Sequence, residues 1–158
     1  MKKIFMFMFA ALTLAVIPSC ENDDENGDGV ENQVEGLALV NGNYVGSIEF
    51  GSSKGLATLL SDANVTVKAY NDNTVDISIP SVRSESYSIE DLFFDIVPVT
   101  PVEEQLDVWN FSKEVEVVVN GTVMKAKITG KLAPRTNQVI ITISISEIGT
   151  LNFNGTKL

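Results

Sequence analysis

The chain has 158 residues, with 11 basic and 21 acidic side chains, a net charge of −10, one cysteine and no histidine. The lack of histidine excludes zinc sites built on imidazole, Ser-His-Asp triads and imidazole general bases. The acidic balance repels phosphate backbones, so we expect no nucleic-acid partner.

Residues 1–19 have the pattern of a secretory signal peptide. Lys2 and Lys3 precede an apolar run over positions 4–17, and a charged region followed by an apolar one is typical of export signals. The run is too short for a transmembrane helix, which needs about 20 apolar residues. We therefore expect this segment to be removed during export.

The end of this segment, Ile17-Pro18-Ser19-Cys20, resembles a bacterial lipobox. The resemblance implies that cleavage precedes Cys20 and that Cys20 and the new N-terminus are acylated, and two or more acyl chains anchor a protein stably. It predicts a lipoprotein of the cell envelope, held to the outer membrane by its lipid. The alternative is an ordinary signal peptide followed by an accidental cysteine.

Residues 20–40 are expected to form the lipidated cysteine and an acidic, flexible tether. Seven acidic residues lie between positions 21 and 35, and such polar segments bury too little apolar surface to fold alone. An acidic stretch after a lipidated cysteine also resembles the surface-export signal of Bacteroidetes lipoproteins, which implies display at the cell surface. The alternative is a solvated linker without export information.

The tether also contains the spacing of an EF-hand calcium loop. The loop needs flanking helices and an apolar residue at its eighth position. Here that position is Glu31 and the incoming helix would come from the cleaved signal peptide, so we predict no metal site. The matching residues are Asp24, Asn26, Asp28, Gly29 and Glu35.

From Asn43 onward apolar residues recur with a period of two, which indicates half-buried strands. The first expected strand runs from Tyr44 to Phe50, and a hairpin follows from Val65 to Ile79 with its turn at residues 71–73. Facing side chains of such a hairpin are apolar on one side and oppositely charged on the other. The expected pairs are Val67 with Ile77, Ala69 with Val75, and Lys68 with Asp76.

The middle of the chain is harder to assign. A strand is expected over Ser84–Ile89 and another over Phe93–Val97, but Ser88–Ile96 also has helical spacing behind a capping-box pattern. We favour the strands, because Pro98 and Pro101 cut a helix short. Val99–Ser112 is then the longest connection and holds the only tryptophan, Trp109.

The clearest hairpin runs from Lys113 to Leu132 around Asn120 and Gly121, a dipeptide favoured in type I′ turns. A two-residue turn fixes the pairing of the two strands. The pairs are Val119 with Thr122, Val118 with Val123, Val117 with Met124, Glu116 with Lys125, Val115 with Ala126, and Glu114 with Lys127. Further strands are expected over Val139–Ile145 and Leu151–Phe153.

About eight short antiparallel strands in residues 41–158 predict a single all-β domain, either a closed barrel or a sandwich. Four segments look like the calycin-like lipoproteins of Bacteroides and relatives. This resemblance implies a small lipocalin-related barrel, and it transfers no functional residues because the family has no established activity. The segments are Gly42–Ser47, Val75–Ile79, Asp95–Thr100 and Gly149–Gly155.

No catalytic constellation is evident. Glu103 with Glu104 and Glu90 with Asp91 are sequence neighbours, and neighbours on a strand point to opposite faces, so neither pair resembles the two facing acids of a glycosidase. Cys20 is committed to the lipid, and no phosphate-binding glycine loop is present. We expect a protein that is not an enzyme and has no cofactor.

The leading hypothesis is a binding module whose barrel mouth takes a small apolar or amphipathic ligand. Trp109 and Tyr44 are the candidate ligand-binding residues, although a lone tryptophan also serves as a core plug. The alternative is a non-enzymatic accessory or structural surface protein that contacts another envelope protein through a sheet edge or loop. An eight-stranded barrel is just wide enough for side chains to fill, so a packed interior is expected.

Overall fold

Alternating burial runs along most strands of the computed structural model, which describes residues 36–53 and 55–158. Two 3-10 turns accompany the strands, η1 (Gly36–Val40) and η2 (Pro134–Thr136). The strands are β1 (Gly42–Ser52), β2 (Gly55–Asn71), β3 (Thr74–Ile79), β4 (Val82–Arg83), β5 (Ser88–Ile89), β6 (Leu92–Pro101), β7 (Trp109–Val119), β8 (Thr122–Ala133), β9 (Gln138–Ile145) and β10 (Gly149–Lys157).

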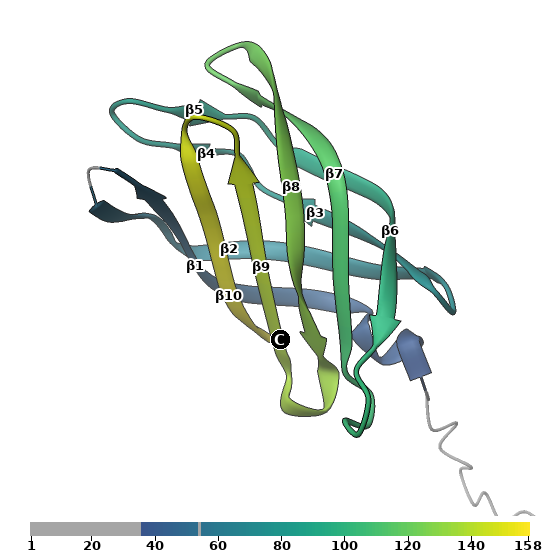
Figure 1. Cartoon of the computed structure of the whole chain (residues 1–158). Helices are drawn as coiled ribbons and strands as arrows, with labels where there is room; N and C mark the ends of the chain where they lie inside the picture. Colours follow the sequence, from purple (N-terminus) through teal and green to yellow (C-terminus); the bar gives the residue numbers. More distant parts are fainter. Residues whose placement is uncertain (1–35, 54) are drawn as a thin grey trace, which may run out of the picture. The chain divides into compact units, whose positions relative to one another are not determined.

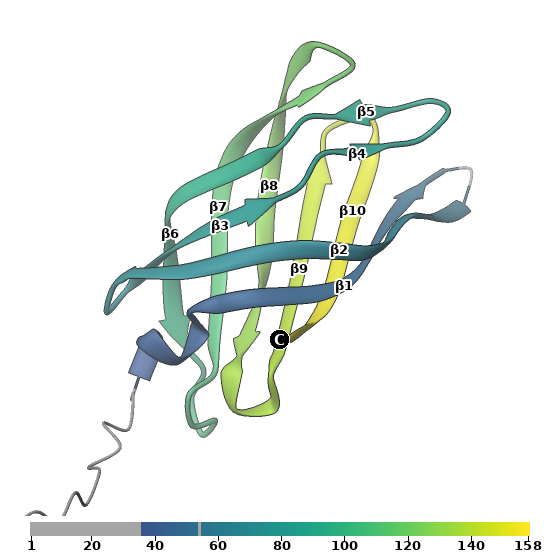
Figure 2. The same ribbon diagram turned by 180° about the vertical axis from the view of Figure 1, so that it is seen from behind.

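Eight of these strands form a closed antiparallel barrel. The order β7-β6-β3-β2-β1-β10-β9-β8 closes on itself because β7 also pairs with β8. The strands curve around a common interior (Figures 1 and 2). The predicted all-β barrel of about eight strands is therefore confirmed, and the sandwich alternative is wrong. In the described part of the chain, no helix has the length and apolar character to cross a membrane.

The two predicted hairpin registers are confirmed pair by pair. β7 and β8 pair Val117 with Met124 and Glu116 with Lys125 around the Asn120-Gly121 turn. β2 and β3 likewise have the register that places Val67 opposite Ile77. In both hairpins the turn sets the alignment, and the alternation then sends the apolar side chains inward.

Apolar side chains fill the inside of the barrel as one hydrophobic cluster. The inward residues Val139, Ile141, Ile143 and Ile145 of β9 are all buried, as the alternation predicted. No polar or charged residue is buried within residues 36–53 and 55–158. The outer face of β7 and β8 carries the exposed charged residues Glu114, Glu116, Lys125 and Lys127, beside the exposed Val123.

The turn η1 covers one end of the barrel. Its Leu37 and Val40 are buried, and the Tyr44 hydroxyl donates a hydrogen bond of 2.9 Å to the Val40 carbonyl. The sequence places residues 36–40 in the tether. In the structure they pack on the barrel instead, because their apolar side chains complete the core.

Several strand boundaries differ from those expected. β2 begins at Gly55, ten residues before the predicted start, and β10 extends to Lys157. β6 continues through both prolines to Pro101, and Trp109 begins β7 instead of lying in a loop. The helix considered over Ser88–Ile96 is wrong, since this segment contains β5 and the first half of β6.

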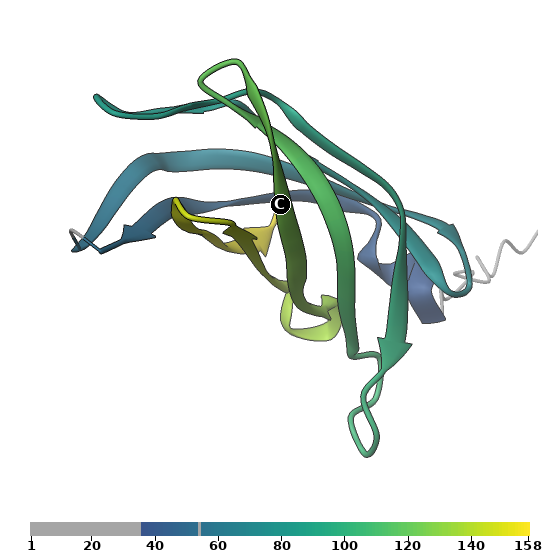
Figure 3. The same ribbon diagram turned by 45° about the horizontal axis from the view of Figure 1, so that its top comes forward.

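β4 and β5 form a short hairpin between β3 and β6. This hairpin bends away from the barrel wall, and Ile89 of β5 pairs with Val119 at the end of β7. The strand expected over Ser84–Ile89 is thus a turn followed by two strand residues. The hairpin projects from the end of the barrel opposite η1 (Figure 3).

Candidate functional site

A groove of about 440 Å³ lies at the end of the barrel away from η1. We call it the end groove. It runs between the tip of the β1–β2 hairpin and the β4–β5 hairpin, which project in the same direction in all three views (Figures 1, 2 and 3). Its lining residues are Phe50, Ser52, Gly55, Leu56, Ala57, Thr58, Leu59 and Arg83–Tyr87.

The first wall is the beginning of β2. From Gly55 to Asp62 no residue is fully buried, and Leu56 and Leu60 are exposed. This part of the strand pairs with β1, but the pairing of β2 with β3 begins only at Thr66. The edge of β2 that faces the groove therefore has no hydrogen-bonded partner strand in the described structure.

The second wall is the turn of the β4–β5 hairpin. The Ser84 hydroxyl accepts hydrogen bonds from the backbone N–H groups of Ser86 and Tyr87, at 3.3 and 3.0 Å. The ring of Tyr87 packs against that of Phe50, with centroids 4.9 Å apart. Because Phe50 belongs to β1, this contact joins the two walls at the floor of the groove.

Two charged side chains line the end groove, Arg83 of β4 and Glu85 of the turn. Neither forms an ion pair with another residue of the described chain. The rest of the lining is apolar or carries hydroxyl groups. The groove thus offers an apolar floor, a main-chain edge and one cation that has no anionic partner.

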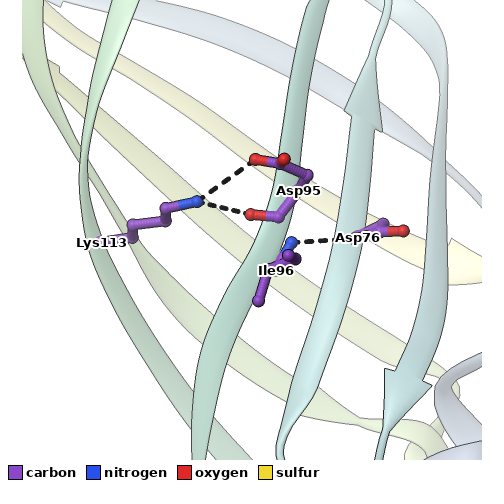
Figure 4. A network of polar contacts seen from close by, with 4 residues as sticks. All are labelled: Asp76, Asp95, Ile96 and Lys113. Carbon is purple, nitrogen blue, oxygen red and sulfur yellow. Dashed lines mark hydrogen bonds and ion pairs between the residues drawn. The ribbon is translucent and has the colours of Figure 1, made fainter.

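A second hollow, of about 570 Å³, opens in the side of the barrel between β6 and β7. We call it the side gap. The two strands pair only where Val99–Pro101 faces Trp109–Phe111. Beyond this paired segment Lys113 of β7 bridges the two strands. Its Nζ donates a 2.5 Å hydrogen bond to the Asp95 carbonyl of β6 and lies 3.4 Å from the Asp95 carboxylate (Figure 4).

The side gap is lined by a bulge in β6. Asp95 and Ile96 lie where the register with β3 shifts, and the Ile96 N–H donates a 2.9 Å hydrogen bond to the Asp76 carboxylate (Figure 4). Its lining carries charges of both signs, including Glu114, Glu116 and Lys125. Because Lys113 already spans the gap and pairs with Asp95, we regard the end groove as the better candidate site.

The described residues hold no cluster of three or more His, Cys, Asp or Glu side chains that could bind a metal ion. The calcium-loop pattern from Asp24 to Glu35 lies outside these residues, and the prediction that it binds no metal stays a prediction.

No protein-family model matches the chain, and no curated protein matches it in sequence. One solved structure is similar in fold, that of a presumed outer membrane protein from Bacteroides fragilis NCTC 9343. It superposes with a TM-score of 0.61 at 16% identity, covering 76% of this chain and 51% of the other. This chain therefore spans about half the length of that protein, and the likeness is one of fold alone.

The candidate residues named from the sequence lie elsewhere. Tyr44 and Trp109 are both buried members of the hydrophobic core, at the barrel end nearer η1 and η2. Neither lines the end groove or the side gap, and their role in ligand binding stays a prediction. Cys20 lies outside the described residues.

Sequence reasoning missed the end groove because its first wall has no periodicity. Residues 55–62 project beyond the barrel, so neither of their faces is fully buried. Only Leu59 packs against the edge of the core, and apolar residues occur on both faces. Leu56, Leu59 and Leu60 in a segment without alternation were the available signal. A short apolar run next to a glycine-rich turn is compatible with an exposed arm as well as with a loop.

Proposed function

We propose that the protein is a non-enzymatic binding module of the cell envelope that holds an apolar or amphipathic ligand in the end groove. The observation that carries the proposal is the apolar floor formed by Phe50, Leu59 and Tyr87 between two projecting walls. Sites for apolar ligands are concave and mostly apolar, with a few polar groups that orient the ligand. Arg83 and the hydroxyl groups of Ser84 and Thr58 would supply that orientation.

The site differs from that of a lipocalin, whose ligand enters the barrel. Here the inward side chains of the strands pack together, so a ligand would lie across the barrel end. The calycin-like relationship suggested by the sequence remains part of the proposal, and the closed eight-stranded barrel supports it.

The envelope location rests on the lipobox ending at Cys20. A wall that faces lipid carries an outward apolar band, whereas β7 and β8 direct charged pairs such as Glu114 and Lys127 outward, with their charged atoms 4.0 Å apart. This surface suits a domain in water beside a membrane, tethered by the acylated N-terminus. The naming of the Bacteroides fragilis protein as a presumed outer membrane protein agrees with this location.

Mass spectrometry of the protein extracted from its own membranes tests the anchor. The N-terminal peptide should begin at Cys20 and carry acyl mass, and Cys20→Ala should release the protein from the membrane fraction. An unmodified Cys20 in the native protein would refute the anchor and leave the groove proposal standing.

Dye binding tests the groove. The mature chain, residues 20–158 with Cys20→Ser so that no acyl chain competes, is titrated with the neutral dye Nile red and then with dodecanoate. Saturable fluorescence that dodecanoate displaces is expected, and Leu56→Asp should weaken it by about tenfold, a change of roughly 1.4 kcal/mol. Tyr70→Asp is the matched control, because Tyr70 is 64% exposed, compared with 65% for Leu56, and lies at the other end of β2, outside the groove lining. Absent or non-saturable binding contradicts the proposal.

The alternative of an accessory protein that contacts another envelope protein is favoured by one specific observation, the unpaired edge of β2. Exposed strand edges bind other chains by pairing. In that case the occupant of the groove is a segment of a protein.

A further inference from the structure

We infer that the end groove binds an extended peptide segment that adds to β2 as a strand and places an acidic side chain against Arg83. The inference rests on the proposed function and names the class of ligand. The free edge of β2, the composition of that edge and the unpaired charge of Arg83 beside it all favour such a ligand.

The free edge is long. β2 spans Gly55–Asn71, but its pairing with β3 covers only Thr66–Asn71. The preceding residues, Gly55 to Val65, pair on one side with β1. On the other side no strand of the described chain is hydrogen-bonded to them, although β4 approaches part of β2. A free edge presents alternating N–H and C=O groups, and an extended peptide satisfies both, whereas an alkyl chain satisfies neither.

The free edge also lacks the features that protect edges in other sheets. Natural edge strands carry lysine, proline or inward charges that prevent pairing with other chains. Residues 55–64, Gly-Leu-Ala-Thr-Leu-Leu-Ser-Asp-Ala-Asn, contain no lysine, arginine or proline and only one charge, Asp62. Leu56 is 65% exposed and Leu60 37% exposed. An edge of this composition is suited to pairing with another chain.

The opposite wall is formed by β4 and the turn that follows it. β4 lies at the end of the strand order and pairs only with β5. The groove between β2 and β4 follows Gly55–Leu59, a length of about 17 Å at the rise of an extended chain. Alternate side chains of a bound strand would point toward Phe50 and Tyr87 and away from them. These two rings favour apolar residues at the inward positions.

Charge complementarity specifies the remaining feature. Arg83 belongs to β4, lines the groove and has no ion pair among the described residues. Arginine binds carboxylates through two parallel N–H groups, which gives direction as well as attraction. Glu85, which also lines the groove, repels a second acid. A peptide with one acidic residue among apolar ones fits this pattern.

Displacement of Nile red from the mature chain tests the inference. The probe is a blocked nonapeptide of alternating Val and Thr with a central Asp, compared with its Asn version and with versions N-methylated at the odd or the even positions. The Asp peptide should displace the dye, and N-methylation of at least one set of positions should abolish displacement because it removes the N–H groups that meet β2. Arg83→Gln should weaken the Asp peptide by about three- to tenfold and leave the Asn peptide unchanged.

Thr58→Lys gives a second test, because a lysine on the edge of β2 should block strand addition and so prevent displacement of the dye by the Asp peptide. Thr156→Lys, on the outer face of β10, is the control and should leave displacement unchanged. Circular dichroism confirms that both variants fold. If dodecanoate displaces the dye but no peptide does, the ligand is a small amphiphile, and the inference fails while the proposed function stands. If neither the dye nor a peptide binds, both fail. Sedimentation showing a dimer that Thr58→Lys dissociates would assign the edge to a second copy and overturn the inference.

Discussion

The side-chain oxygen of Asn120 accepts a hydrogen bond of 2.7 Å from the backbone N–H of Ser88, which joins the β7–β8 turn to the β4–β5 hairpin. The Asn120 amide also donates to the Ser86 carbonyl at 3.2 Å, and its backbone N–H donates to the Ser88 carbonyl at 2.8 Å. Asn120 lies at φ 49°, in the left-handed region. One residue therefore makes the hairpin turn and holds the second wall of the end groove.

Asn120→Gly should keep the turn and release that wall. Glycine tolerates the left-handed backbone, but both side-chain hydrogen bonds are lost, and we expect a loss of about 1–2 kcal/mol in the free energy of unfolding. Hydrogen exchange at the Ser88 amide should accelerate more than exchange in β9. Asn120→Asp retains the oxygen that accepts the hydrogen bond from the Ser88 N–H. Its exchange rate at Ser88 should therefore lie between those of the wild type and the glycine variant. Unchanged exchange at Ser88 in the glycine variant would show that the wall is held by other contacts.

The hairpins were predictable because turn chemistry and alternation specify the same register. The Asn120-Gly121 turn alone aligns Glu116 with Lys125, and the structure has that pair. The beginning of β2 could not be predicted in this way, because a strand that projects beyond the core has no buried face to impose a period.

The predicted strand Phe93–Val97 stops before Pro98, whereas β6 continues through both prolines to Pro101. Pro98 is the last β6 residue paired with β3, and Pro101 is the last paired with β7. Proline lacks an N–H and is tolerated at the ends of ladders. The site was missed for a related reason: the end groove is made by the ends of strands, where the pairing pattern of the barrel stops.

Ile96→Gly should stabilise the protein. Ile96 has φ 47°, and a left-handed backbone costs a branched residue about 1–2 kcal/mol. The Ile96 side chain is 49% exposed, so its removal costs little packing. Glycine should therefore recover roughly 1 kcal/mol of the strain. Urea unfolding measures the change. Ile140→Gly is the matched control, since Ile140 is 45% exposed on β9 and has no such backbone strain, and it should destabilise. Equal losses in both variants would show that Ile96 is not strained.

Gly130→Ala should destabilise the barrel by about 1–3 kcal/mol. An added methyl group would lie 2.1 Å from the Ile140 carbonyl oxygen and 2.3 Å from the Phe111 ring. The backbone oxygen cannot move without disturbing the pairing of β8 with β9. Gly51→Ala in β1 is the comparison, because its nearest neighbour would be 3.5 Å away, and thermal unfolding should show little change. A Gly130 variant as stable as the Gly51 variant would contradict the close approach.

Ionisation of the Tyr44 hydroxyl should lower the free energy of unfolding at alkaline pH. Burial raises its pKa from 10.0 to about 12, so the unfolded chain loses the phenolic proton before the folded protein does. The contribution is fully present below pH 10 and is lost as the pH rises toward 12, by roughly 2–3 kcal/mol in total. Tyr44→Phe removes this dependence and, at pH 8, costs about 1 kcal/mol for the lost hydrogen bond to Val40. The difference between the two proteins in urea unfolding cancels the titration of lysines, which both share. It should shrink and change sign between pH 9 and pH 12, because Tyr44 must regain on folding the proton that the unfolded chain has lost, whereas the phenylalanine variant has no proton to regain. A constant difference over that range would mean that the Tyr44 hydroxyl is solvated in the folded state.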